Sequence, residues 1–182
     1  GSTATTWIAG DSSGKLVATS GDIITGKQGG TNFTNSILLG HNTTGTLTGD
    51  AYSNTGVGVG TFASMVAGNR NTAVGKNALN SSITASNNTA VGVDAMTGIT
   101  TGGYNVAVGV DAFKTNTTGV NNTAVGTYAL KLQQTGIGNT GLGYAAMQSL
   151  TTGGANTAIG YVALNLLTTG ERNVAVGQSA GG

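Results

Sequence analysis

The chain contains no cysteine and no proline, and only 7% of its 182 residues are charged. The absence of cysteine excludes a disulfide framework and a thiolate metal site, and it leaves the cellular compartment open. A net charge of +1 provides no basic patch of the kind that nucleic acids require. No apolar run approaches the roughly 20 residues of a membrane-spanning helix. We therefore expect no nucleic-acid partner and no membrane insertion.

Glycine, asparagine and threonine are abundant instead. The 33 glycines show no three-residue period, which excludes collagen. Asparagine and threonine favour turns and strands over helices. The chain begins with Gly1 and Ser2 rather than methionine, which is typical of a cloning remnant, so we expect a fragment of a longer protein.

A 17-residue repeat dominates the chain from Asn54 onward. Position 3 of each copy is alanine or glycine, position 4 is valine, leucine or isoleucine, position 5 is always glycine, and position 8 is alanine in every copy but the first. Position 9 is leucine, phenylalanine or methionine in all but the last copy. A short fixed period predicts a solenoid, and a copy of this length fits one coil of a parallel β-solenoid. Position 1 is asparagine throughout: Asn54, Asn71, Asn88, Asn105, Asn122, Asn139, Asn156 and Asn173.

The local chemistry of one copy indicates strands separated by turns. Thr123 and Val125 are expected to point to one side of a short strand and Ala124 to the other. A second strand is expected at residues 128–130, followed by a Thr-Thr-Gly turn. Equivalent positions of successive coils would lie roughly 4.8 Å apart. Position 1 should then form an asparagine ladder, positions 4 and 9 an apolar core, and positions 6, 7 and 10 the solvent-facing surface.

A single coil of this kind cannot fold alone, because ordering its whole backbone costs more free energy than burying two or three apolar side chains returns. The small residues of position 3 predict a flat face where copies of the chain pack against one another, since association is a usual remedy for a thin core. The alternative is that these alanines face inward where space is short.

The repeat also suggests how the chain is organised. Residues 1–35 are out of phase and contain two candidate strands, within residues 5–10 and 15–21, which we interpret as an N-terminal cap or connector. A separate ligand-binding module is the alternative. Residues 36–182 form the solenoid domain, with an irregular coil at residues 36–53, one residue longer than the others, and regular coils at residues 54–182.

Several copies resemble a known family. The motifs NNTAVG at residues 121–126, NVAVG at 105–109 and ANTAIG at 155–160 resemble the head repeats of trimeric autotransporter adhesins, and NSILLG at 35–40 is a degenerate form. The longer pattern NTAVGxxALxxxTTG resembles phage-tail-fibre-like and mosaic adhesive trimer proteins. The resemblance covers about residues 36–182. It implies a left-handed parallel β-roll, a homotrimer, and a fibre or adhesive head flanked by a neck, a stalk or a trimerisation chaperone. The longer repeat departs from the adhesin heads, so their surface residues are not carried over.

Few residues have side chains that could bind a metal or take part in catalysis. His41 is the only histidine, so a zinc site or a catalytic triad lacks partners within one chain, and we expect an exposed loop residue. Asp94 and Asp111 share position 7 on adjacent coils, where they could act as an acid–base pair or hold Ca²⁺. A solvated row with mild repulsion is the simpler interpretation. Lys114 and Lys131 share position 10 and are interpreted as a solvated face that discourages lateral association.

Two further motifs are weak. The glycines of residues 56–60 resemble a phosphate-binding loop, but they lack its spacing, its lysine and its helix. The glycosylation pattern at Asn42 and Asn116 is expected by chance in a chain rich in asparagine and threonine. We assign no catalytic, metal-binding or cofactor-binding residue and no cofactor, and the ligand-binding residues are unknown.

The leading functional hypothesis is an adhesive or structural fibre segment at a cell surface, anchored in an outer membrane, or on a virion. It would form a rod of roughly 40 Å and attach to a glycan or a surface protein of a host or prey cell, or serve as a passive spacer without ligand. Ice binding is the second hypothesis, because the threonines of position 14 can form a regular file. These position-14 residues are Thr84, Thr101, Thr118, Thr135, Thr152 and Thr169.

An enzyme is the third and least supported hypothesis, since the sequence has no repeated acid pair, nucleophile or cofactor loop.

Overall fold

The computed structural model describes residues 9–10, 16–17, 33–34, 37–39 and 51–182. These residues form thirteen short strands and no helix. The strands before the regular repeat are β1 (Ala9–Gly10), β2 (Leu16–Val17), β3 (Phe33–Thr34), β4 (Ile37–Leu39) and β5 (Ala51–Tyr52). The strands of the repeat are β6 (Thr55–Val57), β7 (Thr72–Val74), β8 (Thr89–Val91), β9 (Val106–Val108), β10 (Thr123–Val125), β11 (Thr140–Leu142), β12 (Thr157–Ile159) and β13 (Val174–Val176).

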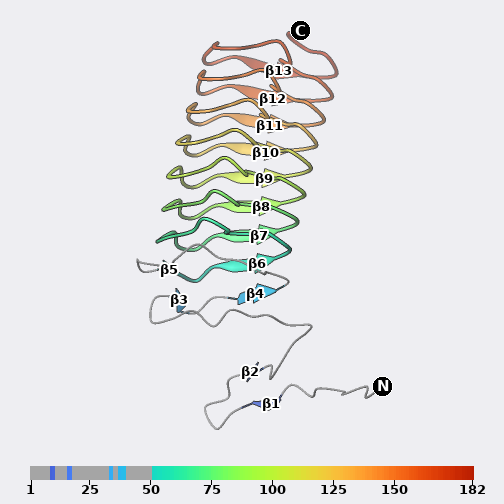
Figure 1. Cartoon of the computed structure of the whole chain (residues 1–182). Coiled ribbons are helices and arrows are strands. Elements are labelled where there is room, and N and C mark those ends of the chain that lie inside the picture. Colours follow the sequence, from blue (N-terminus) through green and yellow to red (C-terminus); the bar gives the residue numbers. More distant parts are fainter. Residues whose placement is uncertain (1–8, 11–15, 18–32, 35–36, 40–50) are drawn as a thin grey trace, which may run out of the picture.

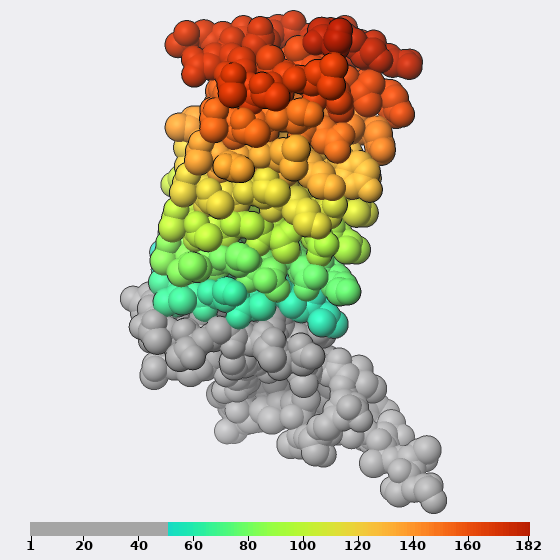
Figure 2. Space-filling view, turned by 45° about the horizontal axis from the view of Figure 1, so that its top comes forward, coloured from blue at the N-terminus to red at the C-terminus, as the bar shows by residue number. Residues whose placement is uncertain are grey.

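The repeat strands stack as the rungs of a parallel β-solenoid (Figure 1). One nine-stranded sheet runs in chain order from β4 and β6 to β13, and each strand residue pairs with its equivalent in the next copy, as Thr123 does with Thr140. The described coils form a continuous column in the space-filling view (Figure 2). The predicted all-β solenoid with 17-residue coils is confirmed. Ile37 pairs with Thr55, and the separation of these two residues is one residue longer than the 17 residues between the paired Thr55 and Thr72. The extra residue is the one expected in the irregular coil.

The direction in which the strand residues face differs from the prediction. Alternation along β10 is as expected, but Ala124 is fully buried within its own chain whereas Thr123 and Val125 lie on the outer surface. The expectation that position 4 faces the core and position 3 faces a sister chain is therefore wrong. A Cβ at Gly141, also in position 3, would lie 3.3 Å from the Ala146 carbonyl oxygen and 3.3 Å from Leu130 Cγ. The space between position 3 and the residues of positions 8 and 9 that face it therefore admits little more than a methyl group.

The second strand expected at residues 128–130 is also absent. This segment forms tight turns, in which the Ala129 amide donates to the Gly126 carbonyl (3.1 Å) and the Lys131 amide to the Tyr128 carbonyl (3.2 Å). Tyr128 and Leu130 both adopt the left-handed conformation, with φ of 63° and 50°. Tyrosine and leucine do not form a strand here, because the chain must reverse its direction within each coil and this requires turn conformations.

The core lies between the sheet and these turns. The apolar residues of position 9 are buried, as predicted, and they stack against the alanines of positions 3 and 8. Position 12 adds further side chains, apolar in some coils and polar in others. The position-9 residues are Phe62, Leu79, Met96, Phe113, Leu130, Met147 and Leu164.

The predicted asparagine ladder is present and binds each coil in two ways. The Asn122 Oδ1 atom accepts the Asn139 amide of the next coil (2.8 Å). The Asn122 Nδ2 group donates to the Gly136 carbonyl (2.8 Å), which closes its own coil. The same pair of bonds recurs from Asn54 to Asn156. These buried side chains satisfy backbone groups where the chain leaves the regular sheet.

Glycine at position 5 is required by the backbone. Gly126 has a φ of 131°, and a Cβ there would collide with the Gly143 carbonyl group of the next coil. The other position-5 glycines have φ between 125° and 139°. Each strand can therefore end on the same residue in every coil and keep the coils in contact.

Two short pairings lie outside the long sheet. β1 and β2 pair antiparallel, and they lie within the two candidate strands of residues 5–10 and 15–21. β3 pairs with β5 in parallel, one coil apart. The cap or connector role of residues 1–35 stays a prediction. In the described part of the chain, no helix is long and apolar enough to cross a membrane.

Candidate functional site

The outward face of the long sheet carries most of the large apolar side chains that are exposed on the described coils. Strand residues at positions 2 and 4 point outward, and position 6 follows just beyond each strand; we call these residues the sheet face. Parallel sheets normally have both of their faces covered, whereas here only the inner face is. Its exposed apolar members are Val57, Val59, Val93, Val108, Val110, Leu142, Tyr144, Ile159, Tyr161, Val174 and Val176.

Charge is almost absent from the sheet face. Lys76 is the single charged residue among positions 2, 4 and 6 of the regular coils, and the remaining polar members are mostly threonines such as Thr123. Val59 and Tyr161, near its two ends, keep 53% and 54% of their surface exposed. A broad, weakly polar face of this kind is typical of protein–protein contact.

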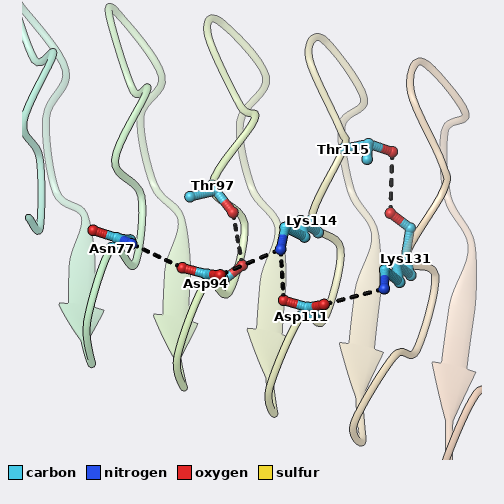
Figure 3. A network of polar contacts seen from close by, with 7 residues as sticks. All are labelled: Asn77, Asp94, Thr97, Asp111, Lys114, Thr115 and Lys131. Carbon is cyan, nitrogen blue, oxygen red and sulfur yellow. Dashed lines mark hydrogen bonds and ion pairs between the residues drawn. The ribbon is translucent and has the colours of Figure 1, made fainter.

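A second feature runs along the turns, at positions 7 and 10 (Figure 3). Asn77 Nδ2 donates to Asp94 Oδ1 (3.0 Å). Lys114 Nζ lies 3.2 Å from Asp94 Oδ2 and 2.9 Å from Asp111 Oδ1. Lys131 Nζ lies 3.1 Å from Asp111 Oδ2. We call this chain of contacts the polar ladder, which connects four successive coils.

The charges of the polar ladder stabilise one another. Burial alone would raise the pKa of Asp111, but hydrogen bonds and the positive charges of Lys114 and Lys131 outweigh it and hold that pKa below its ordinary value. The hydrogen bond to Asp111 raises the pKa of Lys114, against the opposing effect of burial and with help from Asp94. Both groups therefore stay ionised over a wider pH range than usual.

This arrangement changes the interpretation of Asp94 and Asp111. Lys114 bridges the two carboxylates, so they form neither a repelling row nor a free acid–base pair. Within residues 51–182, no three acidic or histidine side chains gather as a metal site. Lys114 and Lys131 are partly covered ion-pair partners rather than a solvated face, with 34% and 27% of their side chains exposed.

A row of tyrosines continues the polar ladder toward the C-terminal coils. Lys131 Nζ lies 4.6 Å from the centre of the Tyr128 ring. The Tyr128 and Tyr144 rings meet edge to face at 5.7 Å, and those of Tyr144 and Tyr161 stack at 5.1 Å. Ring faces that cover one another are less open to a sugar, so the row is chiefly a stabilising stack. Sequence reasoning missed it, although tyrosines at positions 6 and 7 of successive copies were a usable signal.

The other candidates have plain structural roles or lie elsewhere. Glycines 56–60 belong to β6 and the turn after it, and Gly58 meets the backbone of the next coil. Asn116 is fully buried, so it cannot accept a glycan. His41 and Asn42 lie outside the described residues. The six threonines of position 14 are all exposed, as expected for a file that faces water.

Comparison with known proteins gives no match at a significant level. No family model, no curated protein and no solved structure matches this chain.

Proposed function

We propose that this chain is an adhesive or structural segment of a trimeric fibre, whose solenoids lie side by side and meet through the sheet face. The observation that carries the proposal is the row of exposed valine, leucine, isoleucine and tyrosine side chains on an uncovered parallel sheet. The three-fold arrangement and the left-handed coil are parts of the proposal that come from the motif resemblance.

The size of the sheet face supports a stable contact. At about 4.8 Å per coil and 3.3 Å per residue, eight coils of five residues cover roughly 600 Å². This approaches the roughly 800 Å² that each partner contributes to a standard protein interface. A second copy of the chain is a suitable partner, because a row of valines with little charge matches itself better than it matches a charged surface.

The turn side of the coils would then remain outside the fibre. Its side chains vary from coil to coil, as in the change from Asp111 to Tyr128 at position 7. Variation on a rigid, regular scaffold is typical of a recognition surface. A glycan or a protein of a host or prey surface is the proposed ligand class, with the fibre displayed outside a cell or on a virion.

Light scattering on the purified chain tests the association. We expect the molar mass of a trimer for the natural sequence and that of a monomer for Val108→Glu, because three carboxylates would be buried in the contact. Thr118→Glu on the exposed position-14 file is the matched control and should remain trimeric. A monomeric natural chain, or equal behaviour of the two variants, would contradict the proposal.

Adhesion needs a separate measurement. Binding of the trimer to a glycan array and to intact cells tests the ligand class, and substitutions on the turn side should reduce it while the molar mass stays constant. A trimer that binds neither would be a passive spacer.

Ice binding is a second candidate, favoured by the exposed threonine file of position 14. The file is narrow, since neighbouring hydroxyls at position 13 bond to backbone instead: Thr151 Oγ1 donates to the Thr168 carbonyl (2.9 Å). Thermal hysteresis of the purified chain would support this candidate, and its loss in Thr118→Glu would locate the ice-binding surface.

A further inference from the structure

Position 12 of the coils contains polar side chains within the core. Apolar residues occupy this inward position in the first, third, sixth and seventh regular coils, namely Met65, Ile99, Leu150 and Leu167. Asn116 and Gln133 occupy it in two adjacent coils between them, and both are fully buried. Ser82, which is also buried, occupies this position in the second coil. The two adjacent amides are the larger buried polar groups, and they require an explanation.

Each amide has one end bonded and one end free. Asn116 Nδ2 donates to the Gln134 carbonyl (3.0 Å), and Gln133 Nε2 donates to Asn122 Oδ1 (3.1 Å). The Asn116 Oδ1 and Gln133 Oε1 atoms accept no hydrogen bond from any described residue. A buried acceptor without a partner destabilises the fold because it has lost its hydrogen bonds to water, so both oxygens require a donor.

The orientation of both amides is fixed by their partners. If either amide were rotated by 180°, its oxygen would face the Gln134 carbonyl or Asn122 Oδ1, which are themselves acceptors. Rotation of either amide would therefore replace a hydrogen bond by a contact between two acceptors. No described residue supplies a donor to either of the two free oxygens.

We propose that Asn116 and Gln133 bind at least one buried water molecule between their two coils, which donates its hydrogens to Asn116 Oδ1 and Gln133 Oε1. Water fits the chemistry because both free atoms are neutral acceptors. A hard cation such as Ca²⁺ takes six or more oxygen ligands, several of them carboxylates. The core of the described coils offers no carboxylate, since Asp94 and Asp111 both belong to the outer polar ladder.

Water-oxygen magnetic relaxation on the natural chain and on the double variant Asn116→Leu/Gln133→Leu tests this site. Leucine already occupies position 12 in the next two coils, as Leu150 and Leu167, so the variant should fold. We expect the contribution of long-lived internal water to fall by at least one molecule per chain. Leu167→Ile, which keeps this position apolar, is the control and should leave the contribution unchanged.

A crystal structure of the natural chain gives an independent answer that does not depend on the variant. We expect a density peak within hydrogen-bond distance, about 2.7–3.2 Å, of Asn116 Oδ1 or Gln133 Oε1. Equal relaxation in the two proteins, a metal ion at this place, or amides bonded directly to each other would each overturn the proposal.

Discussion

The residues of position 3 and position 4 are neighbours on the same strands, yet they lie in opposite environments. The small residues of position 3, such as Ala124, are buried, whereas the larger residues of position 4, such as Val125, are on the outside. Hydrophobicity alone would give the reverse. The space available at position 3, which admits one methyl group against the residues of positions 8 and 9, therefore decides which row of side chains faces inward. The row of larger side chains at position 4 is then left on the outer surface.

A glutamate substituted at position 3 and a glutamate substituted at position 4 should have different effects on the protein. Ala124→Glu should destabilise the coils by about 4 kcal/mol or more, because an unpaired charge would enter a core with no room for it. Val125→Glu should leave the coils folded and prevent association. Circular dichroism melting and light scattering, measured on both variants, separate the two effects. A folded monomer from Ala124→Glu would mean that the inner and outer files have been exchanged.

The asparagine ladder is a row of polar side chains that, like the alanines of position 3, lies buried within the coils. Asn122→Ala should destabilise the protein by about 2–4 kcal/mol, because the Gly136 carbonyl and the Asn139 amide would lose buried partners. Asn165→Ala is the matched control. Asn165 is only partly buried and donates to the Ala145 carbonyl (3.1 Å), so its loss should cost under about 1 kcal/mol. Urea titration followed by circular dichroism measures both values, and equal losses would refute a special role for the ladder.

The architecture could be predicted from the period of the sequence, because identical spacing forces equivalent residues to stack. The asparagine ladder and the inward position 9 follow from the same argument, and both are present. The facing of positions 3 and 4 could not be predicted this way. A strand pattern shows that neighbours alternate, but it does not show which side is inner, and that choice depends on the depth of the coil.

The contacts of the polar ladder also could not be predicted from the sequence. The shared position of Asp94 and Asp111 was visible in the sequence, but the lysine between them was not, because Lys114 is bonded across coils as well as within its own. The two turn residues with positive φ, Tyr128 and Leu130, likewise have no signal in residue type. Contacts that depend on how turns fold back are set by tertiary packing rather than by local preference.

The glycines of position 15 also lie where there is little space for a side chain. A Cβ at Gly136 would collide with Gln133 Nε2 of its own coil and with the Gly153 carbonyl of the next. The one alanine at this position, Ala85, stands in the coil whose position 12 is the small Ser82. Gly136→Ala should therefore cost about 1–3 kcal/mol, and Gln133→Ser should restore part of it. Thermal melting of the single and double variants measures the coupling, and purely additive changes would argue against this size match.

The polar ladder provides the smallest expected effect, because its charges are partly exposed and each pair contributes under about 1 kcal/mol. The pKa of Asp111 is lowered in the folded chain, so its stabilisation is present above the ordinary value of 3.8 and is lost as the pH falls through the folded pKa. The raised pKa of Lys114 has the opposite sign, and its contribution is lost only as the pH rises above 10.5. Asp111→Asn should therefore lower the melting temperature slightly at neutral pH and leave it unchanged in strong acid. Melting curves at pH 2 and pH 7, in low and high salt, provide the check, and a difference that persists in acid would mean that Asp111 acts through packing rather than charge.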